Sequence, residues 1–376
     1  MAPSINKKFR VLVVDDSAFM RKVLETIFNA DDQLQVIGQA KDGREAIALA
    51  ESLKPDVITM DINMPHVDGL QATAQIMTTN PRPIVIVSSE SREGAASTLK
   101  ALEIGAVEFV AKPSSGIDLD MQSVKEELLR KVRMAAKVRV VRTASRLAST
   151  VQGSSTTGSP ASVASAAAPK RPQAPPDQRF PIVVLGASTG GPATVMRLAP
   201  GFTRDFPAAV FLVQHMPAAF TTQYATQLAE FTSIRVKEAE ANETIQPGTL
   251  YICPGAQHLR VTPTGRIQLD STSGRINGYL PCIDVTMETV AAYAGAMSIG
   301  AVLTGMGNDG AAGAKAIQAA NGLVIAQDEA TSVIFGMPAE AIKVGAVEQV
   351  LGIDDIYAAI EKRVIGICRA TPVGVK

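Results

Sequence analysis

Short apolar runs alternate with helical patterns in two separate blocks of this 376-residue sequence. This alternation limits the possible folds more than any other feature, because it predicts βαβ units on parallel sheets. The first block predicts strands at residues 10–14, 35–39, 57–60, 84–88 and 108–110. The second block predicts strands at residues 182–185, 209–214, 249–252, 299–304, 323–327 and 348–350. We therefore expect an α/β protein with two doubly wound parallel-sheet domains.

The segment between the two blocks has a different composition. Residues 149–177 are mainly Ser, Ala, Pro, Gln and Gly without apolar periodicity. Such a segment cannot bury enough surface to offset the entropy of ordering, so it predicts a flexible tether. Residues 121–146 before it predict a basic, solvated helix. The expected domains are residues 1–125 and 179–376, joined by a basic helix exit and linker over residues 126–178.

The composition limits which classes of binding partner and which cellular compartment we expect. Lys and Arg together number 36, as do Asp and Glu, so net charge gives no indication of nucleic acid or an anionic membrane as partner. Three cysteines without metal-type spacing fit a reducing cytoplasm. Residues 289–308 carry no charge over the length of a membrane span, but their Gly and Ala content favours a packed helix leading into a buried strand. We expect a cytoplasmic protein without direct membrane insertion.

Polar side chains follow the predicted strands of the first block. Asp15 and Asp16 follow the first strand, Asp61 the third and Lys112 the fifth, and Ser88 ends the fourth. In an open parallel sheet these ends meet at one edge, where ligands bind. Neighbouring carboxylates repel each other, and Mg²⁺, which prefers oxygen ligands, relieves that repulsion. A single Asp there would be interpreted as a cap or turn residue, but five groups at matching positions predict a cation and phosphoryl site.

The motif Gly186-Ala-Ser188-Thr-Gly190-Gly191 follows an apolar strand and precedes a helical pattern. It fits the Gly-x-Ser-x-Gly form, in which a sharp turn presents a nucleophilic hydroxyl near helix N–H groups that can bind an oxyanion. The same motif resembles the short-chain dehydrogenase fingerprint, whose enzymes use a Tyr with a Lys four residues later. None of the five tyrosines has that lysine; the residues at this spacing are Leu228, Gly255, Ile283, Met297 and Glu361. The nucleophile interpretation is therefore favoured.

A serine nucleophile needs a base and a residue that orients the base. His215 directly follows one predicted strand, and Asp309 lies in a glycine-rich loop after another. Ser188, His215 and Asp309 are thus expected at the same sheet edge. Their order along the chain differs from that of α/β-hydrolases, but a triad is defined by its geometry.

A competing arrangement uses a different histidine. His258 also follows a predicted strand, and Glu238 or Glu240 could orient it. Both acids lie in a charged segment that we expect to be exposed, so His215 is the preferred base.

Residues 7–125 resemble the response-regulator receiver domain. The resemblance rests on Asp15-Asp16, Met60-Asp61, Met64-Pro65, Asp68-Gly69, Ser88 and Lys112-Pro113. It implies a flavodoxin-like fold in which Asp61 accepts a phosphoryl group from a histidine kinase of a chemotaxis-type pathway. It also implies Mg²⁺ bound by Asp15, Asp16, Asp61 and the Asn63 carbonyl. Ser88 and Lys112 would contact the phosphoryl group, with Phe109 as the switch aromatic.

The second block resembles the chemotaxis protein-glutamate methylesterase. Four motifs carry this resemblance: Gly186 to Gly191, Gln214-His-Met-Pro217, Pro254-Gly-Ala-Gln-His258 and Thr304-Gly-Met-Gly-Asn-Asp-Gly310. They imply a Rossmann-like serine esterase domain without a cofactor. The implied triad is Ser188, His215 and Asp309, with Thr189, Gly190, Met306 and His258 at or near the oxyanion site.

The resemblance also implies a substrate. The family hydrolyses glutamate methyl esters on the cytoplasmic helices of methyl-accepting chemoreceptors, and many members deamidate receptor glutamines. The alternative from a different class is a phospho-switched receptor-binding module without turnover. The complete set of triad candidates favours the enzyme.

Overall fold

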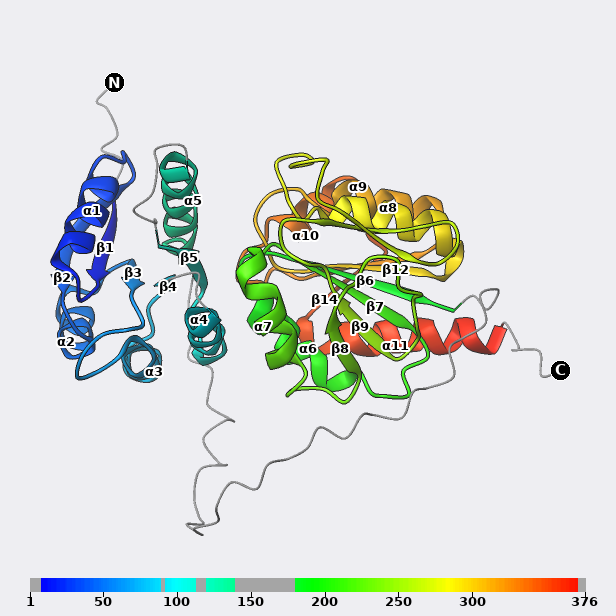
Figure 1. The fold of residues 1–376 in the computed structure, drawn as a ribbon, viewed down its shortest axis with the longest axis horizontal. Coiled ribbons are helices and arrows are strands. Elements are labelled where there is room, and N and C mark those ends of the chain that lie inside the picture. The colour runs from blue at the N-terminus through cyan, green and yellow to red at the C-terminus, as the bar shows by residue number, and fades with distance from the viewer. Residues whose placement is uncertain (1–7, 89–91, 113–119, 139–179, 371–376) are drawn as a thin grey trace, which may run out of the picture.

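The computed structural model describes residues 8–88, 92–112, 120–138 and 180–370, which form two α/β domains (Figure 1). The first holds a five-stranded parallel sheet and the second a seven-stranded parallel sheet with a separate two-stranded hairpin. This confirms the predicted fold class. The predicted tether at residues 149–177 and the predicted helical residues 139–146 lie outside the described residues, and the domain boundaries stay predictions.

The first domain has the strand order β2-β1-β3-β4-β5. All five predicted strands are present, and their ends differ from the prediction by one residue or none. The elements in chain order are β1 (Phe9–Val14), α1 (Ala18–Asn29), β2 (Leu34–Ala40), α2 (Gly43–Leu53), β3 (Val57–Met60), α3 (Gly69–Thr79), β4 (Ile84–Ser88), α4 (Arg92–Ile104), β5 (Glu108–Ala111) and α5 (Asp120–Ala135).

Alternating side chains explain how this sheet is covered on both faces. Val11 and Val13 of β1 pack toward α1 and α5, whereas Leu12 and Val14 pack toward α2, α3 and α4. All four side chains are buried. Successive residues of a strand point to opposite faces, so a continuous apolar run fills both cores at once.

The predicted basic helix at residues 121–146 is shorter than expected. Helix α5 ends at Ala135, where Lys137 and Val138 donate to carbonyls three residues back and tighten the last turn. Its basic side chains are also not all solvated, because Lys131 is only 9% exposed and donates to the Phe109 carbonyl at 2.8 Å. Apolar residues on either side of Lys131 face the sheet, and this packing draws the lysine stem inward.

The second domain has the strand order β14-β13-β12-β6-β7-β9-β8. Its elements in chain order are β6 (Ile182–Ala187), α6 (Gly191–Leu198), η1 (Ala199–Gly201), β7 (Ala209–Gln214), α7 (Ala218–Leu228), β8 (Arg235–Glu238), β9 (Thr249–Ile252), β10 (His258–Val261), β11 (Ile267–Asp270), α8 (Ile283–Ala294), η2 (Gly295–Met297), β12 (Ser298–Val302), α9 (Ala311–Ala319), β13 (Leu323–Gln327), α10 (Met337–Lys343), β14 (Gln349–Leu351) and α11 (Ile353–Ala370).

Three strands of this domain were not predicted, and one ends early. β8 is a charged edge strand, and β10 pairs with β11 in a short hairpin, so neither region carries a long apolar run. β12 ends at Val302 instead of Thr304, because the Thr304 N–H donates to the Gln327 side chain at 2.9 Å rather than to a strand. The ends of the other predicted strands differ by two residues or fewer.

Helices cover both faces of the seven-stranded sheet. Helices α8, α9 and α10 pack on one face, and α6, α7 and α11 on the other (Figure 1). The uncharged residues 289–308 form the end of α8, η2, β12 and the loop after it, as predicted. No helix among the described residues is long and apolar enough to span a membrane.

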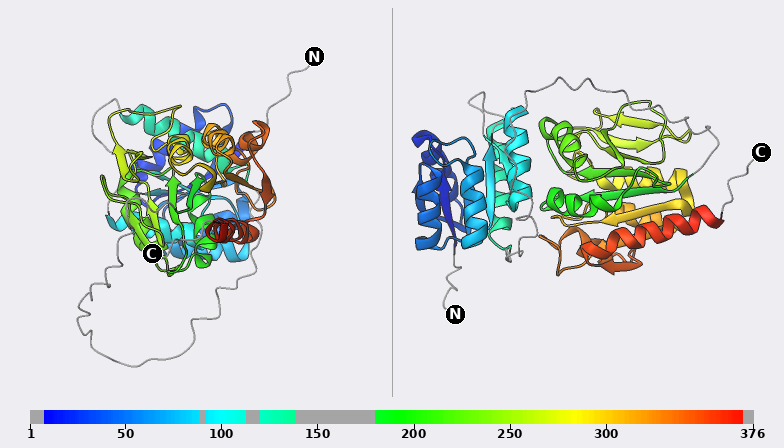
Figure 2. Two further views of the ribbon diagram at one scale, coloured as in Figure 1. Left: turned by 90° about the vertical axis from the view of Figure 1, so that its right-hand side faces the viewer. Right: turned by 90° about the horizontal axis from the view of Figure 1, so that it is seen from below.

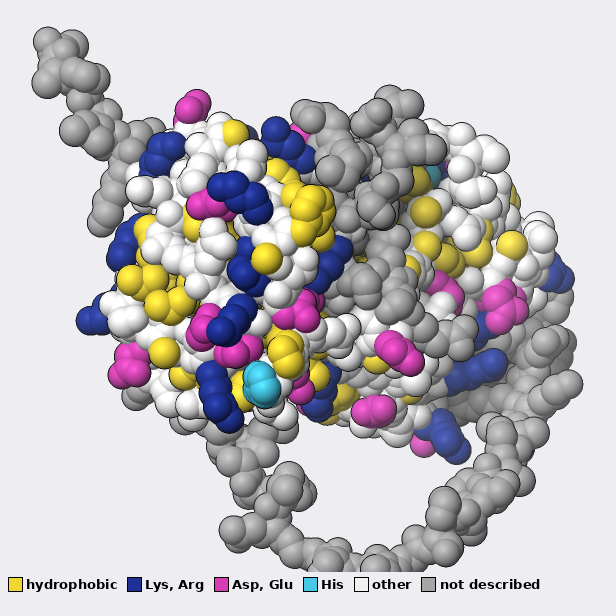
Figure 3. Space-filling model, turned by 60° about the vertical axis from the view of Figure 1, so that its left-hand side comes forward, with side chains coloured by type: hydrophobic (Ala, Val, Ile, Leu, Met, Phe, Trp, Pro, Cys, Tyr) yellow, Lys and Arg dark blue, Asp and Glu magenta, His cyan; other side chains and the backbone are white. Residues whose placement is uncertain are grey.

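The two domains meet through α4 and β5 of the first and α7 of the second (Figures 1 and 2). The Phe109 ring lies 4.5 Å from the Phe220 ring between centroids, and Gln227 Nε2 donates to Glu103 Oε2 at 3.1 Å. On the face of the first domain drawn in Figure 3, acidic and basic side chains are interspersed. The sequence did not predict this contact between the domains.

Two phenylalanines of α1 allow a matched test of the core. Phe28 is fully buried, whereas Phe19 is 75% exposed. We expect Phe28→Ala to lower the free energy of unfolding of the first domain by about 3–5 kcal/mol. Phe19→Ala should change it by about 0.5 kcal/mol or less. Hydrogen exchange of the β1 amides across a urea series measures this stability separately from that of the second domain. Equal effects of the two substitutions would contradict the packing of α1.

Candidate active site and candidate phosphorylation site

Three carboxylates meet at the carboxyl edge of the five-stranded sheet. Asp15 and Asp16 follow β1 and Asp61 follows β3, and one oxygen of each lies within 4.8 Å of the others. Asp15 and Asp61 are buried, and Asp16 is exposed. Lys112 Nζ lies 2.8 Å from Asp61 Oδ2 and 3.0 Å from Asp15 Oδ2. The structure therefore brings together four of the five charged or hydroxyl groups expected at this edge.

Burial shapes the electrostatics of this acidic site. Desolvation raises the pKa of Asp61, and the hydrogen bond and charge of Lys112 only partly oppose it. Burial by itself lowers the pKa of Lys112, but its bonds to Asp61 and Asp15 outweigh this and raise it. One ammonium facing three carboxylates leaves excess negative charge on hard oxygen donors. This donor set fits Mg²⁺, which Asp15, Asp16, Asp61 and the Asn63 carbonyl would hold.

The remaining residues predicted in the first domain lie around this edge. Ser88 ends β4, is 2% exposed and pairs in register with Ala111, next to Lys112. Asn63 is exposed in the loop after β3. Phe109 lies in β5 and contacts the second domain through Phe220. Ser88 is therefore one strand away from β5, which lies at the interface between the domains, and Lys112 directly follows β5.

The turn after β6 carries Ser188 between the strand and α6. The Ser188 N–H donates to the Thr304 carbonyl at 3.0 Å, and the Gly191 N–H donates to the Ser188 carbonyl at 2.8 Å. Gly190 has φ +75°, and a Cβ there would lie 2.5 Å from Val333. Within the described residues, the N–H groups of Thr189, Gly190 and Met306 have no acceptor. Free amides beside a nucleophile are the donors that an oxyanion needs.

The predicted base and its orienting carboxylate meet beside this turn. β12, β6 and β7 are neighbours in the sheet, so the loops that follow them converge. His215 Nε2 lies 2.7 Å from Asp309 Oδ2, and the His215 N–H donates to the Ala187 carbonyl at 3.0 Å. Nδ1 therefore carries the lone pair that can accept a proton. No hydrogen bond joins Ser188 Oγ to His215 in the part of the chain that the structure describes; such bonds often tighten only with substrate.

Asp309 is 1% exposed, and its charge is held by several donors. Besides His215, it accepts N–H bonds from Ile283 at 2.7 Å, Asp284 at 2.9 Å and Gly310 at 3.0 Å. Two of these amides open α8, where helix N–H groups favour an anion. Burial raises the pKa of Asp309, but the His215 bond and charge and the backbone bonds outweigh it and lower the pKa. The carboxylate is thus kept ionised to orient the imidazole.

A second buried carboxylate supports this loop. Asp284 accepts the N–H groups of Gly310 at 2.9 Å and Gly313 at 2.7 Å. The pKa of Asp284 is raised to about 6. Burial is the largest cause, and the charge of Asp309 raises the pKa further. This role could not be predicted from the sequence, since Asp284 lies far from the predicted motifs.

His258 does not form the competing arrangement. It is fully buried, with Nε2 donating to the Gly274 carbonyl at 2.8 Å and Nδ1 accepting the Cys282 N–H at 3.1 Å. Glu238 instead accepts from Thr222 at 2.7 Å, and Glu240 pairs with Lys237 at 2.7 Å. Both ring nitrogens of His258 are therefore used by the backbone, and neither acid orients it.

Sequence reasoning assigned no role to two residues at the serine turn. Gln214 Nε2 donates to the Ser188 carbonyl at 2.9 Å, from the end of the neighbouring strand β7. Glu108 of the first domain accepts from the Thr189 hydroxyl, with 2.6 Å between Oε2 and Oγ1. Only strand pairing could have pointed to Gln214, and only the packing of the two domains reveals Glu108.

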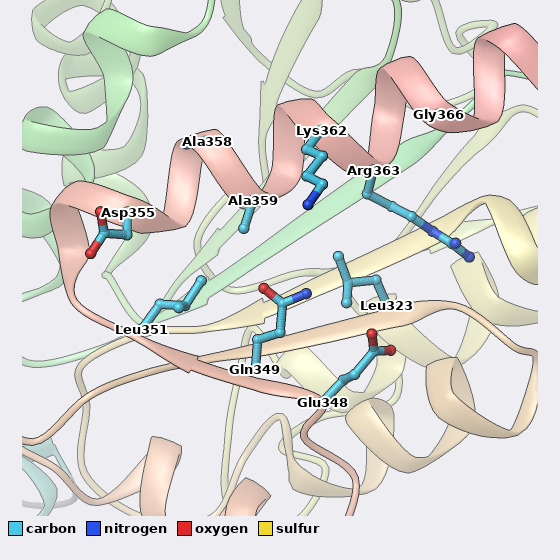
Figure 4. Close-up of a pocket in the computed structure, with 10 residues that line it drawn as sticks. All are labelled: Leu323, Glu348, Gln349, Leu351, Asp355, Ala358, Ala359, Lys362, Arg363 and Gly366. Atoms are coloured by element: carbon cyan, nitrogen blue, oxygen red, sulfur yellow. The ribbon is translucent and has the colours of Figure 1, made fainter.

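A cavity of about 490 Å³ lies elsewhere in the second domain, between α11 and the sheet edge formed by β13 and β14 (Figure 4). Charged side chains such as Glu348, Lys362 and Arg363 surround its apolar floor. None of its lining residues belongs to either predicted site.

The raised pKa of Asp61 leads to a test of the acidic site. Because the fold disfavours its charge, Asp61→Asn should stabilise the first domain at pH 7 without Mg²⁺. This advantage should shrink as the pH falls through the folded-state pKa and vanish below the unfolded value of about 3.9. Hydrogen exchange of the β1 amides at several pH values measures the difference.

Mg²⁺ should reverse the order of stability of the wild-type domain and the Asp61→Asn variant. It should stabilise the wild-type domain by about 2.7 kcal/mol at a concentration 100-fold above its Kd, and the variant much less. Asp32→Asn, an exposed change in the same domain, should leave the Mg²⁺ response unaltered. An unchanged response of Asp61→Asn would contradict the metal site.

Comparisons with known proteins place both halves of the chain in known families. A family model for the response regulator receiver domain matches residues 11–123, and one for the CheB methylesterase matches residues 183–360. A protein-glutamate methylesterase/protein-glutamine glutaminase from Pyrococcus horikoshii is 40% identical over 96% of this chain and 95% of the relative. One from Symbiobacterium thermophilum is 41% identical over 97% of this chain and 99% of the relative. The crystallised catalytic domain of Thermotoga maritima CheB methylesterase is 38% identical, covers 49% of this chain and 99% of its own, and has a TM-score of 0.48. The chain belongs to the protein-glutamate methylesterase/protein-glutamine glutaminase family.

Proposed function

We propose that this protein is a phosphorylation-activated serine esterase that hydrolyses glutamate methyl esters on the cytoplasmic helices of chemoreceptors. The observation that carries the proposal is the buried Asp309 carboxylate paired with His215 beside the Ser188 turn. The names of the relatives support the substrate, and the receiver domain supports a histidine kinase as phosphodonor. This activity is expected in the cytoplasm, where the receptor helices and the kinase are accessible.

The acylation step uses the three residues in distinct roles. His215 Nδ1 takes the Ser188 hydroxyl proton while Oγ attacks the ester carbonyl carbon. Asp309 holds the ring by its bond to Nε2 and stabilises the imidazolium that forms. The free N–H groups of Thr189, Gly190 and Met306 are the candidate donors to the oxyanion. The imidazolium then gives its proton to the departing methoxy group, and methanol leaves.

Deacylation restores the enzyme. His215 takes a proton from water while the water oxygen attacks the acyl carbon. The imidazolium then returns that proton to Ser188 Oγ as the acyl–Oγ bond breaks, which leaves a glutamate carboxyl group on the receptor and regenerates Ser188. A receptor glutamine can follow the same route with ammonia as the leaving group, in keeping with the second activity in the names of the relatives.

The contact between the domains explains how the receiver can hold this site inactive. Phe109 packs on Phe220 of α7, and Glu108 binds the hydroxyl of Thr189, the residue after the nucleophile. A receptor helix about 10–12 Å wide has to reach the same loops. The Glu108 carboxylate also places negative charge near the position where the oxyanion forms, which opposes catalysis electrostatically.

Phosphorylation releases the active site from its contact with the receiver domain. A phosphoryl group on Asp61 adds charge that Ser88 and Lys112 can engage, and this shifts the loops around Phe109. The acidic residues Asp15, Asp16 and Asp61 would hold a Mg²⁺ ion there, which would supply positive charge for the phosphoryl transfer. Glu108 precedes Phe109 in the chain, so movement of the aromatic side chain withdraws the carboxylate from Thr189.

Loss of any triad residue should remove the activity. Ser188→Ala, His215→Ala and Asp309→Ala should each lower kcat for methanol release from methylated receptor by at least about 10³-fold, with little further loss in combination. His258→Gln, which changes a backbone anchor but leaves the triad intact, should lose far less activity than any of these. If His258→Gln abolishes turnover while His215→Ala retains it, the base is assigned wrongly. Failure of a serine-directed phosphonate to label Ser188 would favour the binding module without turnover.

Breaking the contact between the domains should mimic phosphorylation. Glu108→Ala should raise the unphosphorylated activity by roughly 5- to 150-fold, the range of ordinary coupling free energies. Glu93→Ala, an exposed change in α4, should not.

A phosphodonor with Mg²⁺ should activate the full chain, but neither Asp61→Ala nor a fragment starting at Arg179. That fragment should exceed the unphosphorylated full chain in methanol release. Equal stimulation of the fragment by the donor would refute gating through Asp61.

A further inference from the structure

A small hairpin between β11 and α8 reaches the active site. Ile276 and Tyr279 exchange two backbone hydrogen bonds of 3.0 and 2.9 Å. Asn277 and Gly278 between them have φ of 52° and 87°. Two positive φ values with an Asn-Gly pair define a type I′ turn, the turn that suits a two-residue hairpin. The segment is therefore an ordered hairpin although most of its residues are exposed.

Buried groups fix both ends of this hairpin. His258 donates to the Gly274 carbonyl before the turn and accepts the Cys282 N–H after it. Asp270 accepts the N–H groups of Thr272 and Ser273 at 2.9 and 3.1 Å. Since His258 is fully buried, the two ends of the hairpin are tied to the core of the domain.

Tyr279 lies directly on the catalytic imidazole. Its ring and the His215 ring are stacked, with 4.7 Å between centroids and an angle of 16° between planes. The hydroxyl end reaches over the loop that carries Met306, because a Cβ on Gly307 would lie 1.9 Å from Tyr279 Oη. Tyr279 therefore connects the proposed base with the proposed oxyanion loop.

We propose that Tyr279 is a positioning residue that holds the His215 ring in the orientation needed for proton transfer from Ser188. The inference rests on the proposed function of the triad. A single hydrogen bond to Asp309 fixes one nitrogen of the imidazole but leaves the ring free to tilt about that bond. A stacked aromatic ring removes the tilt on one face, and the anchored hairpin keeps the tyrosine in place. Misplacement of a reacting group by about 1 Å can cost 10²-fold in rate.

The position of Tyr279 also fits a second role, contact with the receptor helix. The two roles predict different kinetics. A positioning residue acts on every substrate of Ser188, including a small one that touches nothing else. A receptor contact acts on KM for the receptor and has no influence on a small reagent.

The experiment uses the full chain activated by a phosphodonor with Mg²⁺. Two rates are measured for each variant: methanol release from methylated receptor, as kcat and KM, and phosphonylation of Ser188 by a small fluorophosphonate. Tyr279→Ala should lower kcat and the phosphonylation rate together by roughly 10- to 100-fold, with KM changed less than about threefold. Tyr279→Phe keeps the stacked ring and should restore both rates to within about twofold of wild type.

Arg275→Ala serves as the matched control, because Arg275 is exposed in the same hairpin and its bond to the Gly278 carbonyl, at 3.3 Å, involves neither of the stacked rings. It should leave both rates near wild type, and near-UV circular dichroism should show each variant folded. The proposal is overturned if Tyr279→Ala raises KM alone, if Tyr279→Phe loses as much as Tyr279→Ala, or if Arg275→Ala lowers both rates equally.

The same assay separates this inference from the proposed function. A wild-type chain that releases no methanol contradicts the proposed substrate. In that case the phosphonylation rates of the Tyr279 variants still decide whether the stacked ring positions the base.

Discussion

Parallel pairing forces every strand of a sheet to end at the same edge, and both sites of this protein follow from that constraint. In the first domain it gathers Asp15, Asp61 and Lys112 from three strands. In the second domain it brings the loops after β12, β6 and β7 together, and these loops carry Asp309, Ser188 and His215. Residues far apart in the chain thus become neighbours because the strands that carry them pair in the sheet.

Burying charge at such an edge is unfavourable unless each charge has partners. The two domains meet this requirement in different ways. Asp309 is surrounded by backbone N–H groups and an imidazole, which lower its pKa and favour its charged form. Among the described residues Asp61 is bonded to Lys112 and to the Ile62 N–H, and burial outweighs them and leaves its pKa raised. The first arrangement suits a fixed orienting group, and the second suits a group whose charge changes when a metal or a phosphoryl group arrives.

The interface between the domains joins these two sites in one short stretch of β5. Phe109 faces an aromatic ring of the second domain, and Glu108 beside it reaches the turn of the nucleophile. Lys131 binds both the Phe109 carbonyl and the Glu108 carboxylate, at 2.8 and 3.4 Å. A movement of β5 therefore changes apolar packing and a charge beside the active site together. This coupling supports a receiver that controls chemistry as well as access.

The sequence by itself determined the two-domain α/β fold, the positions of the long apolar strands within two residues and the edge at which each candidate residue lies, but it missed the short strands β8, β10 and β11. Hydrophobic periodicity and the position of a residue at a strand end are local properties. Short segments such as Val11 to Asp16 and Gly186 to Gly191 are enough to predict them. The tertiary structure alone decided that His258 anchors a hairpin, that Tyr279 stacks on His215 and that Glu108 binds Thr189. These contacts join segments separated by tens of residues or by a whole domain. Their geometry depends on how layers and loops pack, and no local pattern in the chain encodes it.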